Sequence, residues 1–183
     1  EINIQPNIIL LEPFGRNTAP AVTIAALKAL EIENDPTLLI LSSDHIMKDE
    51  ENFIKTIIAG LHYSNKGRLV TFGVIPDSPE TGYGYIKSKE SMVDINLGGS
   101  DIDSFIEKPD IKKAKELIKD KKYLWNSGIF MFKPDTLIQE IKKFNPEIYD
   151  IASVLEESLI SDLDFQRLDK KIFKSIPNIS IDY

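Results

Sequence analysis

The chain has 183 residues, enough for one domain with a sizeable core, and 42% of them are hydrophobic. Its formal net charge of −7 argues against general nucleic-acid binding, and the absence of cysteine excludes disulfides and thiolate metal sites. No apolar run approaches the roughly 20 residues of a membrane span, and no signal peptide opens the chain, so a cytoplasmic protein is expected.

The first part of the chain predicts strands that alternate with helices. The expected strands are residues 8–11, 38–41 and 69–73, and the expected helices are 21–32 and 49–64. This alternation indicates parallel crossovers and a doubly wound sheet. Thr18 is the predicted N-cap of the first helix, whose free amides and partial positive charge suit a phosphate or the polar edge of a base.

An acidic residue follows the most uniformly apolar of these strands. Residues 38–41 are four aliphatic residues in a row, which predicts a strand buried on both faces, and they lead into Ser42, Ser43 and Asp44. Ligands of open α/β sheets bind beyond the carboxyl ends of strands, where an aspartate can hold Mg²⁺ near phosphates. The alternative is that Asp44 caps the following helix or lies in a solvated loop.

A proline- and glycine-rich loop at residues 75–85 changes the character of the chain. Strands are expected at 85–89 and 102–107, and two successive strands suggest an antiparallel extension. Within the loop, Gly82 lets the backbone approach a ligand, and Tyr83 could stack on a sugar or simply pack.

Polar residues also mark the remaining strands. Glu107 and Lys108 could converge on a ligand or form a surface charge pair. Asn126 precedes a buried strand at 129–132, and a polar group in that setting needs a protein or ligand partner. Helices are expected at 111–119, 134–144 and 146–159, and the end of the chain, 177–183, alternates like a strand around Asp182.

Five stretches taken together resemble the mannose-1-phosphate guanylyltransferases, most closely the bacterial class that includes bifunctional phosphomannose isomerase/guanylyltransferases. They are EPFGRNTAPA (12–21), LSSDH (41–45), FGVIPDSPETGYGYI (72–86), FIEKP (105–109) and YLWNSGIFMF (123–132). The final SIDY (180–183) resembles the start of that family's SIDYAVMEK segment.

The resemblance implies an α/β, Rossmann-like nucleotidyltransferase fold with a mixed sheet flanked by helices. Residues 1–74 would belong to the nucleotide-binding half and 75–183 to the sugar-binding half. The implied reaction is Mg²⁺-dependent transfer of GMP from GTP to α-D-mannose 1-phosphate, which yields GDP-mannose and pyrophosphate. No nucleic acid or membrane is expected as a partner, and homo-oligomerisation is left open.

The resemblance also assigns roles to individual residues. Asp44 and Asp182 match the metal-binding acids, and Asp44 also contacts the nucleotide. The base-recognition loop contains Glu12, Asn17 and Thr18, and Glu12 can accept from guanine. On the sugar side, Gly82 and Tyr83 match the mannose loop, Glu107 accepts from hydroxyls, Lys108 holds the sugar phosphate, and Asn126 lies at the pocket floor. Arg16 is left open between a structural and a nucleotide contact.

The chain departs from the family pattern at both ends. The opening G-x-G-x-R loop and the later P-K-Q are missing, as is the segment that follows SIDY. We therefore expect a fragment truncated at both ends, with little activity by itself. Two alternatives remain open: a non-catalytic nucleotide-sugar-binding module, and a nucleotidyltransferase of the same fold with another base or sugar specificity.

Overall fold

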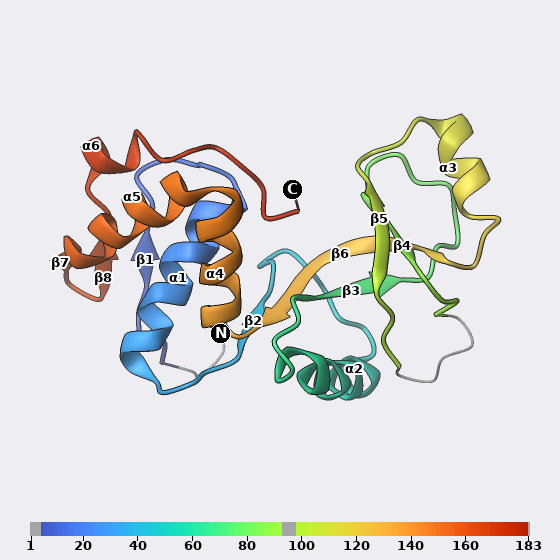
Figure 1. The fold of residues 1–183 in the computed structure, drawn as a ribbon, viewed down its shortest axis with the longest axis horizontal. Coiled ribbons are helices and arrows are strands. Elements are labelled where there is room, and N and C mark those ends of the chain that lie inside the picture. Colours follow the sequence, from blue (N-terminus) through green and yellow to red (C-terminus); the bar gives the residue numbers. More distant parts are fainter. Residues whose placement is uncertain (1–4, 93–97, 183) are drawn as a thin grey trace. The chain divides into compact units, whose positions relative to one another are not determined.

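The chain folds as two units that interleave along the sequence (Figure 1). In this computed structural model, residues 5–92 and 98–182 are described. The terminal unit comprises Glu1–Pro36 and Lys133–Tyr183, and the central unit comprises Thr37–Phe132.

The terminal unit is a small sheet and a group of packed helices. Its helices are α1 (Thr18–Ile32), α4 (Pro134–Phe144), α5 (Pro146–Glu157) and α6 (Lys170–Phe173). Its strands are β1 (Leu10–Leu11), β7 (Ile160–Asp162) and β8 (Phe165–Arg167), in the order β1-β8-β7. Helix α1 packs on both α4 and α5, and β1 runs parallel to β8.

A buried apolar cluster joins these elements. It contains Ala19, Ile24, Ile148, Ala152, Leu155, Leu168, Phe173 and Ile176. The cluster brings the start of α1 together with α5, α6 and the segment that follows α6, so residues near the two ends of the chain share one core.

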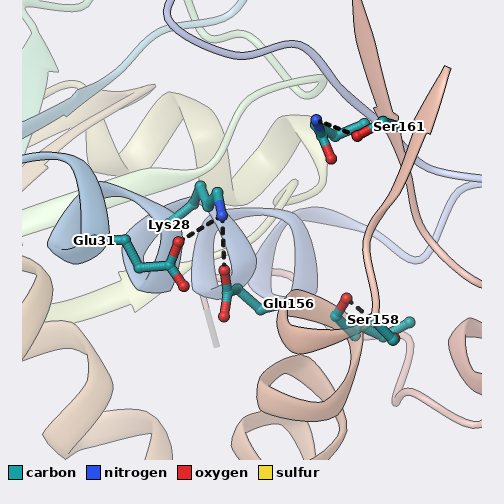
Figure 2. A network of polar contacts seen from close by, with 7 residues as sticks. Lys28, Glu31, Glu156, Ser158 and Ser161 are labelled. Atoms are coloured by element: carbon teal, nitrogen blue, oxygen red, sulfur yellow. Dashed lines mark hydrogen bonds and ion pairs between the residues drawn. The ribbon is translucent and has the colours of Figure 1, made fainter.

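An ion-pair network adds a polar link between α1 and α5. Lys28 Nζ lies 2.5 Å from Glu31 Oε2 and 3.0 Å from Glu156 Oε1, and Figure 2 shows the lysine between the two carboxylates. Burial raises the pKa of Glu156, while hydrogen bonds to Glu31 and Glu156 raise the pKa of Lys28. The shared cation therefore offsets the cost of placing a carboxylate between the helices.

The central unit is built on one long strand. Its strands are β2 (Leu38–Ile40), β3 (Val70–Val74), β4 (Tyr85–Ser88), β5 (Ile102–Ile106) and β6 (Tyr123–Phe132), and its helices are α2 (Glu50–Ser64) and α3 (Ile111–Leu117). Strand β6 pairs antiparallel with β2, β3 and β4, and β5 pairs antiparallel with β4. Because Met131 pairs with both β2 and β3, and Trp125 with both β3 and β4, β3 lies along one edge of β6, and β2 and β4 along the other.

The α/β class with mixed sheets flanked by helices is confirmed, but the predicted pairing is only partly right. The β2–α2–β3 segment is a crossover, as predicted, and its two strands run parallel to each other because both run against β6. The doubly wound parallel sheet is wrong for the described strands, since every ladder of the larger sheet is antiparallel. Within the described residues, no helix has both the length and the apolar character needed to cross a membrane.

Two stretches differ from the predicted elements. Residues 38–41 are half-buried or exposed rather than buried on both faces. The predicted strand at 177–183 is wrong for its described part, where Ile181 and Asp182 form a turn, and Tyr183 lies outside the described residues. On α2, the large apolar side chains of Ile54 and Ile58 are 57% and 61% exposed.

Candidate functional site

The ends of three paired strands gather the predicted sugar-binding residues of the central unit. At the start of β4, Tyr85 pairs with Ile106 at the end of β5 and with Trp125 in β6. The next residue of β6, Asn126, donates its backbone N–H to the Gly84 carbonyl at 2.7 Å. Pairing of the strands therefore fixes the 82–84 loop, the end of β5 and Asn126 against one another.

Asn126 lies within β6, not before the strand as the sequence predicted. Its side-chain Oδ1 accepts from Thr71 Oγ1 at 3.1 Å and from the Gly128 N–H at 3.3 Å. Gly128 has φ = 70°, and the β3–β6 register shifts nearby. These bonds satisfy the side-chain carbonyl of Asn126 within an irregular stretch of sheet, where the Ile129 carbonyl is a second acceptor for the Thr71 hydroxyl at 3.1 Å, and the strand continues through it.

Gly84 is the glycine of the mannose-loop segment that packing requires. A Cβ at this position would lie 2.7 Å from Phe105 Cζ and 2.8 Å from Glu107 Oε2. At Gly82 an added Cβ would meet nothing within 4 Å. The close contact therefore holds the Glu107 carboxylate directly against the loop backbone at Gly84.

The side chains of Glu107 and Lys108 form an ion pair with each other. Lys108 Nζ lies 3.2 Å from Glu107 Oε1, just beyond the end of β5, and both residues are exposed. Lys108 has φ = 43° immediately before Pro109, a combination that the proline ring disfavours. Such backbone strain clusters at functional sites. The ion pair itself is compatible with a ligand-binding pair and with a surface pair.

Aromatic contacts complete this group. The rings of Tyr83 and Trp125 pack edge to face, with centroids 5.2 Å apart. Tyr83 is 50% exposed, and the Trp125 Nε1–H is buried with no hydrogen-bond partner among the described residues. The half-exposed Tyr83 ring therefore lies next to Trp125, whose indole N–H is buried.

Asp44 lies in an exposed turn after β2. Ser42 Oγ donates to its Oδ1 at 2.5 Å, and this bond, followed by a backbone hydrogen bond, lowers the pKa of Asp44. The alternative that Asp44 caps α2 is wrong, because Asp49 is the N-cap and accepts from the Asn52 N–H at 3.1 Å. The solvated-loop alternative agrees with its exposure.

The predicted base-recognition loop of the terminal unit is fixed by contacts with α6. Phe14 packs edge to face on Phe173, with centroids 5.4 Å apart. Arg16 lies over the Phe14 ring at 5.2 Å and donates from Nη2 to the Lys174 carbonyl at 2.5 Å. Arg16 Nε is buried without a partner among the described residues. All these Arg16 contacts are structural.

Protein groups occupy the amide donors at the start of α1. The N-cap is Asn17, with φ = 63°, and not Thr18 as predicted; its side chain accepts from the Thr18 N–H. The Ala19 N–H donates to the Ile179 carbonyl at 3.1 Å, and Pro20 has no N–H. The expectation of free amides for a phosphate or base is therefore wrong for the first three residues of α1.

Glu12 and Asp182 complete the predicted residues of this unit. Glu12 is at the surface, but neighbouring protein atoms partly desolvate its carboxylate and raise its pKa. Asp182 is half-buried, and its Oδ2 accepts from Ser180 Oγ at 2.7 Å. The terminal unit thus holds Glu12, Asn17, Thr18 and Asp182, and the central unit holds Asp44 and the sugar-side residues.

The sequence did not single out Ser180 or Thr71, which donate hydrogen bonds to Asp182 and Asn126. A serine two residues before an aspartate occurs at both Asp44 and Asp182, and this repeated spacing was the available signal.

Two cavities do not coincide with the predicted residues. One of about 810 Å³ lies between α2, β3 and residues 88–92 and 98–102, and one of about 490 Å³ lies between α1 and residues 7–10; none of the predicted site residues lines either.

The donor set can be compared with what metals require. Among the residues that the structure describes, no three histidine, cysteine or acidic side chains cluster as a metal site. Mg²⁺ needs only one or two carboxylates together with water and phosphate oxygens. Asp44 fits that requirement, because it is an exposed carboxylate that water and a phosphate can approach. Asp182 supplies the same hard oxygen chemistry.

Comparisons with known proteins agree with one another. The family described as "Nucleotidyl transferase" matches residues 1–171. The chain is 43% identical over 183 residues to the xanthan biosynthesis protein XanB of Xanthomonas campestris, and 45% identical over 188 residues to the mannose-1-phosphate guanylyltransferase RfbM of Salmonella typhimurium. All of this chain aligns in both cases, but it spans only 38% of the length of each of these curated relatives.

A solved structure, that of mannose-6-phosphate isomerase from Helicobacter pylori, matches with a TM-score of 0.82 and 34% identity. That match covers 96% of this chain and 66% of the other.

Proposed function

This chain belongs to the nucleotidyl transferase family, and on that premise we propose that it transfers GMP from GTP to α-D-mannose 1-phosphate. The products are GDP-mannose and pyrophosphate. The choice of guanine and mannose is carried by the relatives that are named mannose-1-phosphate guanylyltransferase, one of which is 45% identical over 188 residues. A cytoplasmic location belongs to the same proposal.

The reaction is an in-line displacement. A phosphate oxygen of mannose 1-phosphate attacks the α-phosphorus of GTP, a new P–O bond forms, and the bond to the β-phosphate breaks and releases pyrophosphate. Catalysis of such a transfer is mainly positioning and electrostatic stabilisation. Asp44 and Asp182 are the proposed Mg²⁺ ligands, and bound Mg²⁺ would neutralise charge on the phosphates.

The sugar-side roles belong to the same proposal, and the geometry of the central unit supports them. Lys108, beside Glu107 at 3.2 Å, would hold the sugar phosphate, while Glu107 accepts from sugar hydroxyls. Asn126 is fixed by Thr71 and would bound the sugar pocket. Gly82 and Tyr83 would contact mannose, Gly82 through its backbone, and Tyr83 through its half-exposed ring.

On the nucleotide side, Glu12 would accept from the N1–H and the exocyclic amine of guanine. Asn17 and Thr18 follow it in the loop that Arg16 and Phe14 fix to α6. We propose a structural role for Arg16, because its described contacts are with a carbonyl and an aromatic ring.

The test is a nucleotide and sugar panel on the product of the complete gene. GTP with mannose 1-phosphate should release pyrophosphate and give GDP-mannose faster than UTP, CTP, dTTP or ATP with mannose 1-phosphate or glucose 1-phosphate. A preference for another pair would reassign the specificity. If GDP-mannose raises the melting temperature while no pair releases pyrophosphate, the protein is a binding module instead.

A further inference from the structure

A chain of hydroxyl groups connects helix α1 to the proposed metal ligand of the terminal unit. Thr18 Oγ1 and Ser180 Oγ lie 3.1 Å apart, although 162 positions separate these residues in the sequence. Ser180 Oγ lies 2.7 Å from Asp182 Oδ2. The Ile181 N–H donates to Thr18 Oγ1 at 2.9 Å, and the Asp182 N–H to Ser180 Oγ at 3.4 Å.

The chemistry of these groups fixes the direction of the chain. A carboxylate only accepts hydrogen bonds, so Ser180 uses its one hydroxyl proton on Asp182. Thr18 must then donate in its contact with Ser180, and it accepts from the Ile181 N–H. The bonds run in one direction from the Ile181 amide through Thr18 and Ser180 to Asp182.

A backbone hydrogen bond and the shared core also hold residues 176–182 beside α1. The Ala19 N–H donates to the Ile179 carbonyl at 3.1 Å, and Ala19 and Ile176 are both buried in the core of the terminal unit. The segment that carries Asp182 therefore lies beside the first turn of α1. The position of the carboxylate depends on α1 as well as on its own neighbours in sequence.

We propose that Ser180 and Thr18 are positioning residues that orient the Asp182 carboxylate for metal binding. This inference rests on the proposed function, in which Asp182 is a Mg²⁺ ligand. It also restricts Thr18: its hydroxyl proton is committed to Ser180, so toward a nucleotide Thr18 could only accept a hydrogen bond.

The experiment measures metal binding directly on the complete gene product. Mn²⁺ binding would be titrated by electron paramagnetic resonance in the presence of GDP-mannose, alongside the Mg²⁺ dependence of turnover. Ser180→Ala and Thr18→Val should each weaken Mn²⁺ binding by about 10- to 100-fold, the usual effect of removing a group that orients a ligand. Ser180→Thr and Thr18→Ser, which keep the hydroxyl, should restore most of it.

Two further readouts separate orientation from general damage. The Thr18→Val/Ser180→Ala double variant should lose no more affinity than the worse single variant, because both residues act through one chain. Hydrogen exchange at the Ile181 amide should accelerate in Thr18→Val and stay unchanged in Ser175→Ala. Ser175 is the matched control, because its hydroxyl donates to the Ile172 carbonyl in the same part of the chain.

Asp182→Asn distinguishes the two ways to fail. If Asp182→Asn binds Mn²⁺ and turns over like wild type, the metal role of Asp182 is wrong. If Asp182→Asn loses Mn²⁺ binding while Ser180→Ala and Thr18→Val stay within about twofold of wild type, well below the effect expected for orienting groups, only the positioning inference is overturned. Should Ser180→Ala not fold, Thr18→Val compared with Thr18→Ser decides the same question.

Discussion

Asp44 and Asp182 each accept a hydrogen bond from a serine two residues earlier, but the two serines differ in what else they contact. Ser42 donates to Asp44 within an exposed turn, and no other hydrogen bond of Ser42 occurs among the described residues. Ser180 donates to Asp182 and also meets Thr18 of α1. The serine–aspartate hydrogen bond therefore makes no side-chain link to a helix at Asp44, whereas at Asp182 it is linked to α1 through Thr18.

The two hydrogen bonds affect different properties of the carboxylates, the charge of Asp44 and the position of Asp182. In the turn at Asp44, the bond from Ser42 acts on charge, since it is the largest cause of the lowered pKa. At Asp182, the bond from Ser180 acts on position, because it belongs to a chain of hydrogen bonds that passes through Thr18 of α1. Loss of the first hydroxyl should change a pH dependence, and loss of the second should change metal affinity.

The largest expected effects come from the acids themselves. Asp44→Asn and Asp182→Asn should each lower kcat by at least about 100-fold, as removal of a key charged group in a transfer site does. They should differ in stability. Asp182→Asn weakens the acceptor of the Ser180 hydroxyl and should lower the free energy of unfolding by about 1 kcal/mol, and Asp44→Asn should lower it less, because the bond from Ser42 lies in an exposed turn.

Pyrophosphate release would measure kcat of the two variants, and urea unfolding would measure their free energies of unfolding. Equal stability of the two variants would contradict the idea that only Asp182 is tied into its unit.

Glu12 extends the comparison, because its pKa moves in the opposite direction to that of Asp44. Glu12→Gln replaces one of two acceptor oxygens by an amide NH2 group, which is a donor and would face the guanine donors. It should weaken GTP binding by about 1–3 kcal/mol, which raises Kd by roughly 5- to 150-fold. Calorimetric titration of GTP would measure this.

The stability of Glu12→Gln carries its own sign. Burial raises the folded-state pKa of Glu12, so ionisation opposes folding, and wild-type stability falls as the pH rises through the ordinary carboxyl range toward the raised value. Glu12→Gln lacks this loss and should be at least as stable as wild type at neutral pH. A variant that binds GTP normally would remove Glu12 from base recognition.

Gly84→Ala tests the sugar side of the central unit. The new Cβ would lie 2.7 Å from Phe105 Cζ and 2.8 Å from Glu107 Oε2, so Glu107 must move. The KM for mannose 1-phosphate should rise about 10-fold, the equivalent of roughly 1.4 kcal/mol, while the KM for GTP stays unchanged. Gly15→Ala is the matched control in the terminal unit, since its Cβ would meet nothing within 4 Å. An equal rise of both KM values in Gly84→Ala would indicate general disruption.

Helices were the most predictable part of this fold. The predicted helix at 134–144 coincides with α4, and the predicted helix at 49–64 begins one residue before α2, because the patterns that mark a helix are local. The extent of β6 was not predictable, since Asn126 and Gly128 resemble a loop until the Thr71 hydroxyl is known to satisfy Asn126. The pairing of β6 with three strands was likewise invisible, because periodicity identifies a face and not its partner.

The site divides in the same way. The sequence identified the residues around Gly84, Glu107 and Asn126, and the structure brings them together, but their roles remain predictions. It could not identify Ser180 as a positioning residue, because that role depends on Thr18, 162 positions away. The sequence-based prediction was also wrong at the start of α1. There the Ala19 N–H, which a helix end would otherwise leave free, donates to the Ile179 carbonyl.

The smallest expected effect is that of Ser42→Ala, which removes the main cause of the lowered pKa of Asp44. The hydrogen bond from Ser42 favours the charged form of Asp44. Without the hydroxyl, the carboxylate takes up its proton at a higher pH, so the acidic limb of the kcat profile should shift to higher pH while activity at neutral pH is retained. Ser43→Ala is the neighbouring control, because Ser43 makes no hydrogen bond among the described residues. An unmoved limb would mean that another group controls it, and that the hydroxyl beside Asp44 does not set its charge.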